Sequence, residues 1–137
     1  MTSKVIVYYS ATGNTSAMLK CFNEDEFDII NIRKDKTVDF DKYDIIIFGT
    51  STWGRGIPPR PFFNIRDDLV RIKNKKIGLF GSGRTEFEFF CGALDLLEEL
   101  LKKDNEIIFK FKYEGYPKDI DFDKFSKLVK ETFYETN

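Results

Sequence analysis

Residues 4–9 read KVIVYY, residues 43–49 read YDIIIFG and residues 75–81 read KKIGLFG, and these three runs decide the fold that the sequence predicts. Each is short, nearly continuous in apolar residues and followed or ended by a turn-forming residue. Such runs are typical of strands that are buried on both faces of a parallel sheet. We therefore expect three central parallel strands.

Weaker patterns complete the sheet. Residues 27–32 and 106–112 are shorter or more charged, which is typical of edge strands, and Lys110 and Lys112 would discourage pairing with another sheet. Helical periodicity lies between the strands, over residues 15–22, 62–72, 90–103 and 121–134, and Asp121 is the expected N-cap of the last helix. Residues 33–42 are charged and suit a loop or a single turn.

Strands that alternate with crossovers predict an α/β fold, a three-layer, doubly wound parallel sheet with right-handed connections. No linker divides the sequence, so we expect residues 1–137 to form a single domain.

Composition excludes several classes of function. The 137 residues include no His, so Ser-His and Cys-His relays and HExxH zinc sites are excluded. Cys21 and Cys91 are far apart, which leaves no CxxC pair and favours two reduced thiols. With 22 Lys+Arg against 23 Asp+Glu, nothing indicates nucleic-acid binding. The first apolar run is too short for a signal peptide or a membrane span, so we expect a cytoplasmic protein.

In a doubly wound sheet the ligand lies beyond the carboxyl ends of the central strands, so the loops after those strands decide the function. The first loop, residues 10–15, supplies hydroxyls, a glycine and the amides of a helix N-terminus, which together suit a phosphate. It has no Lys and is therefore not a GxxxxGK[ST] loop. An ordinary helix cap explains its hydroxyls equally well. Its residues are Ser10, Ala11, Thr12, Gly13, Asn14 and Thr15.

The second loop, residues 50–56 (TSTWGRG), holds the single Trp of the chain among small residues. Trp53 in this position suits stacking on a flat ligand, although a Trp folded over the end of the sheet is an equally good interpretation. The third loop, residues 81–93 (GSGRTEFEFFCGA), is rich in Phe and lacks the third Gly of a dinucleotide fingerprint.

Taken together, the three loops resemble those of the flavodoxin family. SATGNTSAM is similar to the family's phosphate loop, TSTWG to its second flavin loop, and FGSGRTEFEFFCGALDLLEE to the stretch along the isoalloxazine edge. The resemblance covers residues 4–101. The sequence lacks the insertion that splits the last strand of long-chain members, so it resembles the short-chain group.

The resemblance implies a five-stranded sheet of order 2-1-3-4-5 that binds FMN noncovalently and shuttles single electrons between redox proteins. Residues 10–15 would hold the phosphate, Trp53 would stack on the inner flavin face and Phe87 would cover the outer face. Gly54 would turn its peptide to offer a carbonyl to the semiquinone. The remaining residues of the implied cofactor site are Ser51, Thr52, Ser82, Gly83, Arg84, Phe89 and Cys91, of which Arg84, Phe89 and Cys91 would meet the pyrimidine edge through backbone groups.

Two departures from the family bear on its partners. Most members have Tyr at the position of Phe87, and most have acidic residues where Arg55 and Arg84 stand. Residues 51–66 carry a formal charge of +3 and residues 82–88 a charge of −1, so this rim sums to +2, from Arg55, Arg60, Arg66, Arg84, Glu86 and Glu88. We expect a monomer that docks at the FMN edge with an acidic face of its partners, a flavin or iron–sulfur reductase as donor and an acceptor of unknown identity.

Three alternatives share this sheet. The flavodoxin-like activator of manganese ribonucleotide reductase has a Gly-rich loop with no Trp at the place of Trp53. A quinone or nitro reductase would need a nicotinamide site and usually a longer chain. A signalling receiver would need carboxylates after the first strand, where this sequence has Ser-Ala-Thr.

Overall fold

The structure is a computed structural model that describes residues 3–10, 13–34, 37–51, 59–84 and 91–134. At its centre is a parallel sheet of five strands in the order β2-β1-β3-β4-β5. This confirms the predicted strand order, with the two more charged strands at the edges. The strands are β1 (Lys4–Tyr8), β2 (Asp28–Asn31), β3 (Ile45–Ser51), β4 (Lys76–Gly83) and β5 (Glu106–Glu114).

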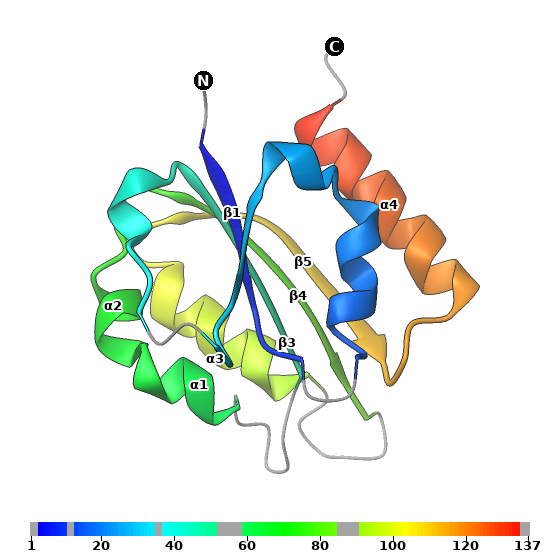
Figure 1. Cartoon of the computed structure of the whole chain (residues 1–137), viewed down its shortest axis with the longest axis horizontal. Helices are drawn as coiled ribbons and strands as arrows, with labels where there is room; N and C mark the ends of the chain where they lie inside the picture. The colour runs from blue at the N-terminus through cyan, green and yellow to red at the C-terminus, as the bar shows by residue number, and fades with distance from the viewer. Residues whose placement is uncertain (1–2, 11–12, 35–36, 52–58, 85–90, 135–137) are drawn as a thin grey trace.

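Helices cover both faces of the sheet (Figure 1). One face is covered by α1 (Arg60–Asn64), α2 (Arg66–Val70) and α3 (Gly92–Leu101), and the other by the 3-10 helix η1 (Ser16–Cys21) and α4 (Asp119–Phe133). Two further 3-10 turns, η2 (Glu24–Glu26) and η3 (Phe40–Lys42), lie in the connections to β2 and β3. None of the helices in the described ranges combines the length and the apolar composition that crossing a bilayer requires.

Each face of the sheet has its own apolar core. Beneath α1, α2 and α3 lie the buried side chains of Phe48, Leu79 and Leu97. Beneath η1 and α4 the core is largely aromatic, and the ring of Phe125 lies 4.9 Å from Phe111 and 5.3 Å from Phe80, centroid to centroid. Aromatic pairs at such distances contribute about 0.5–1.5 kcal/mol beyond their buried area. The many Phe residues therefore hold α4 against the sheet.

The edge lysines of β5 have a role that the sequence does not reveal. The ammonium groups of Lys110 and Lys112 both pair with the Asp95 carboxylate on α3, and Lys110 also pairs with Glu98 at 2.9 Å. These contacts tie β5 to α3. A positive charge at the sheet edge still opposes pairing with another strand.

Three predicted helices differ from the structure. The expected helix over residues 62–72 is instead α1 and α2, because the backbone of Ile65 (φ −102°, ψ 14°) leaves helical values between them. Residues 15–22 form the 3-10 helix η1 rather than an α-helix. Asp121 is not the N-cap of α4: the helix begins at Asp119, and the Asp121 carboxylate accepts from the amide of Lys118 at 2.9 Å.

Candidate functional site

Three neighbouring strands end at the same edge of the sheet. In the register of the sheet, Tyr8 near the end of β1 pairs with Gly49 of β3, and Ser51 at the end of β3 pairs with Ser82 of β4. The loops after β1, β3 and β4 therefore leave from one edge, at the bottom of Figure 1. The carboxyl edge of a doubly wound sheet is where ligands bind in this class of fold.

The loop after β1 is held by its own hydroxyls. The Ser10 hydroxyl accepts from the amide of Ser16 at 3.2 Å, and the Gly13 carbonyl accepts from the amide of Ala17 at 3.0 Å. Gly13 has φ +91°, a left-handed value that favours glycine, and no atom lies within 4 Å of a Cβ built there. The loop therefore turns tightly and leaves open space in front of Gly13. Ala11 and Thr12 lie outside the described residues.

Thr15 is the residue of this loop that most clearly indicates a ligand. It is fully buried, and its hydroxyl makes no hydrogen bond of ordinary geometry to the residues that the structure describes, although it lies beside the Tyr113 hydroxyl. It caps no amide of η1. An unsatisfied buried hydroxyl is costly, so proteins rarely keep one without a purpose. A phosphate oxygen bound in the loop would supply the missing partner.

The loop after β3 is described only at its start. Ser51 is half-buried at the end of the strand, and its carbonyl accepts a hydrogen bond from the Thr50 hydroxyl at 2.8 Å. Thr52, Trp53 and Gly54 lie outside the described residues. The predicted role of the Trp53 indole in stacking therefore stays a prediction.

β4 ends in two buried residues, Ser82 and Gly83, and the loop after it begins with the exposed Arg84. A Cβ built on Gly83 would lie 2.7 Å from the backbone nitrogen of Cys91, so only glycine lets the two ends of this loop approach so closely. The predicted site residues Phe87 and Phe89 lie between these ends, outside the described residues.

Cys91 closes the third loop. It has φ 53° and precedes α3, and its buried Sγ donates to the carbonyls of Gly81 (3.6 Å) and Tyr113 (3.7 Å). Burial raises the pKa of the Cys91 thiol to about 11, partly offset by nearby Lys112. The thiol therefore stays protonated near neutral pH, and it acts as a hydrogen-bond donor rather than as a nucleophile.

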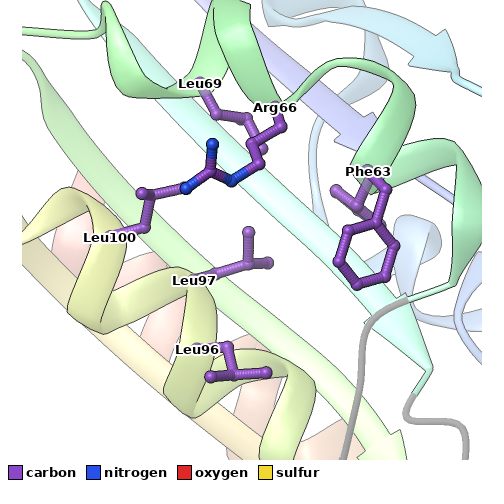
Figure 2. Close-up of a pocket in the computed structure, with 7 residues that line it drawn as sticks. Phe63, Arg66, Leu69, Leu96, Leu97 and Leu100 are labelled. Atoms are coloured by element: carbon purple, nitrogen blue, oxygen red, sulfur yellow. The ribbon is translucent and has the colours of Figure 1, made fainter.

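An apolar groove lies between α1, α2 and α3. Its volume is about 220 Å³. Figure 2 shows Phe63, Arg66 and the leucines of α3 facing one another across it. Arg66 of α2 is one of the residues that line this groove.

The structure also brings one unexpected residue to the site. Tyr113, next to the last residue of β5, is 2% exposed, and its hydroxyl donates to the carbonyl of Asn14 at 2.8 Å. Burial raises the pKa of this phenol, which the neighbouring Thr15 hydroxyl lowers in part. The one signal in the sequence is that Tyr113 directly follows the strand predicted over residues 106–112, at the same edge of the sheet.

Comparison with known proteins gives one consistent result. The family model for flavodoxin matches residues 6–109. The probable flavodoxin 2 of Bacillus subtilis is 37% identical over 114 residues, covering 75% of this chain and 74% of that protein. The flavodoxin of Maridesulfovibrio salexigens is 32% identical over 135 residues, covering 85% and 89%. The solved structure of oxidised flavodoxin 1 from Bacillus cereus superposes with a TM-score of 0.88 at 27% identity, over 99% of this chain and 100% of that one.

Proposed function

Because the chain belongs to the flavodoxin family, we propose that the three loops at the carboxyl edge of its sheet hold FMN in a defined orientation. The chain is an FMN-dependent electron carrier and not an enzyme, and neither the reductase nor the reductase-activator alternative is favoured by its relatives. The flavin supplies the one-electron chemistry. The residues of the chain bind it, orient it and exclude water from it.

The phosphate end of FMN rests on the loop after β1 in this proposal. The observation that carries it is the buried Thr15 hydroxyl, which has no partner in the described part of the chain. Ser10 lies at the start of the same loop, and Gly13 leaves room for a ligand to approach the backbone. A pocket of hydroxyls and backbone amides suits one terminal phosphate dianion. We assign Ala11, Thr12 and Asn14 to the same pocket from their place in the motif.

The flavin ring lies between the second and third loops in this proposal. Trp53 stacks on its inner face and Phe87 covers its outer face. Ser51, Thr52 and Gly54 are the other residues of the second loop that contact the flavin in this proposal. The buried Ser82 and the tight approach of Gly83 to Cys91 support a third loop whose backbone is preorganised to receive the pyrimidine edge. Arg84, Phe89 and Cys91 would contribute backbone groups to that edge.

We further propose that partner proteins dock at this edge through an acidic face, because Arg84 is exposed at the start of the third loop. A flavin or iron–sulfur reductase is the class of donor that suits a one-electron carrier. Cys21 and Cys91 are both free thiols. This supports a reducing compartment, the cytoplasm, as the place where the protein acts.

The direct test is the identity of the bound cofactor. Heat should release a flavin whose mass is that of FMN. The apoprotein should gain about 2.7 kcal/mol of stability at a hundredfold excess of FMN over its dissociation constant. FAD in the extract, or no stabilisation by FMN, would refute the proposal. Steady NAD(P)H oxidation without an added reductase would indicate the reductase alternative.

A further inference from the structure

We propose that Tyr113 is a positioning residue that holds the phosphate loop in its binding conformation and so makes the site prefer FMN over flavins without a phosphate. The inference rests on the proposed function. Its basis is the hydrogen bond from the Tyr113 hydroxyl to the Asn14 carbonyl, 2.8 Å long, which joins residues 99 positions apart in the sequence.

The topology of the sheet makes this contact informative. Tyr113 belongs to the edge strand β5, and β3 and β4 lie between β5 and β1, the strand from which the phosphate loop leaves. Tyr113 therefore reaches across the end of the sheet to a loop that does not neighbour it in the strand order. Asn14 stands between Gly13, with its left-handed backbone, and Thr15, with its unsatisfied hydroxyl. Fixing the Asn14 carbonyl thus fixes the peptide that leads into Thr15.

Tyr113 is itself held firmly. Its side chain is 2% exposed within the aromatic core beneath α4, and the Phe111 ring lies 6.2 Å away. Burial raises the pKa of its phenol, so the hydroxyl keeps its proton and remains a donor near neutral pH. A buried donor on a rigid strand can impose a conformation on a short loop at little entropic cost.

The same residue supports the third loop through its backbone. The Tyr113 carbonyl accepts from the buried Cys91 Sγ at 3.7 Å, and Cys91 ends the third loop. The two contacts use different groups of Tyr113, the hydroxyl for the phosphate loop and the carbonyl for the third loop. Removing the hydroxyl alone should therefore disturb phosphate binding and leave the ring end of the site intact.

The test compares two ligands and two variants. Apoprotein of wild type, Tyr113→Phe and Tyr43→Phe is titrated with FMN and with riboflavin, which carries the same ring without the phosphate, and binding is followed by quenching of flavin fluorescence. Tyr43→Phe is the matched control, because its hydroxyl donates to the Asp28 carboxylate at 2.7 Å at the opposite edge of the sheet. It loses a comparable hydrogen bond far from the three loops.

We expect Tyr113→Phe to weaken FMN binding about three- to tenfold and riboflavin binding less than about twofold, the range of one hydrogen bond. Tyr43→Phe should lower thermal stability and leave both affinities unchanged. An equal loss for both ligands, or no loss for FMN, would overturn the role of Tyr113. If the wild-type apoprotein fails to bind FMN, the proposed function itself is refuted, so the two failures are distinct.

Discussion

Replacing Thr15 with Val should make the apoprotein more stable and FMN binding weaker. Thr15 is fully buried and its hydroxyl has no partner among the described residues, so folding removes the hydroxyl from water without compensation. Valine has the same shape and the same branching at Cβ, so packing and backbone preference barely change. The substitution removes only the uncompensated polar group.

The magnitude follows from that burial. An unsatisfied buried hydroxyl costs about 1–3 kcal/mol, so the variant should gain stability near the lower end of this range. For a domain of this size, each kcal/mol corresponds to roughly 3–5 °C in melting temperature. A hydrogen bond from the hydroxyl to a charged phosphate contributes about 1.5–3 kcal/mol, so FMN binding should weaken about ten- to hundredfold.

The assay is thermal unfolding of the apoprotein together with FMN titration, and Thr50→Val is the matched control. Thr50 is equally buried, but its hydroxyl donates to the Ser51 carbonyl at 2.8 Å. Its replacement should therefore destabilise the apoprotein by about 0.5–1.5 kcal/mol. If Thr15→Val behaves like Thr50→Val and FMN affinity does not change, the hydroxyl serves the fold and not the cofactor.

Three further results are expected. Trp53→Ala should weaken FMN binding by about 1–3 kcal/mol in a fluorescence titration, the range for aromatic stacking, whereas unchanged affinity with lower stability would show a core role. Arg84→Asp should lower the potential of the second one-electron reduction by about 40–70 mV at low salt, for a reversed charge at about 10 Å and an effective dielectric of about 40–80, and a redox titration without this shift would place its charge away from the flavin. The pKa of Cys91 is raised from 9.0 to about 11 by burial, so the stability it contributes is complete below pH 9 and is lost as pH rises toward 11. Denaturant unfolding should show this decline in wild type, with Cys91→Ala declining less.

The strands were predictable because their signal is local. β1, β3 and β4 are apolar runs bounded by turn residues, and they lie within two residues of their predicted limits at each end. The limits of the helices were harder to predict, since a regular apolar spacing does not reveal where the backbone dihedral angles leave helical values. Ile65 keeps its side chain buried, as the pattern predicts, while its backbone divides the expected helix in two.

The candidate site was likewise predictable in one part and not in another. It was predictable that the loops after β1, β3 and β4 leave from one edge of the sheet, because the order of strands in a doubly wound sheet determines which strand ends are neighbours. The contribution of Tyr113 was not, because nothing near residue 113 indicates that its hydroxyl reaches Asn14. A contact between distant parts of the sequence depends on strand order, register and side-chain direction together. A single sequence does not specify all three.

The edge strand β5 therefore does more than complete the sheet. It carries none of the three loops, yet its carboxyl end contacts two of them: the Tyr113 hydroxyl donates to the loop after β1, and the Tyr113 carbonyl accepts from Cys91 at the end of the third loop. Just beyond the strand, the amide of Gly115 donates to the carbonyl of Gly83 at 3.1 Å. In a chain without His, no imidazole can relay protons at the site. The end of β5 is where the structure ties Asn14, in the loop after β1, to Cys91, at the end of the third loop.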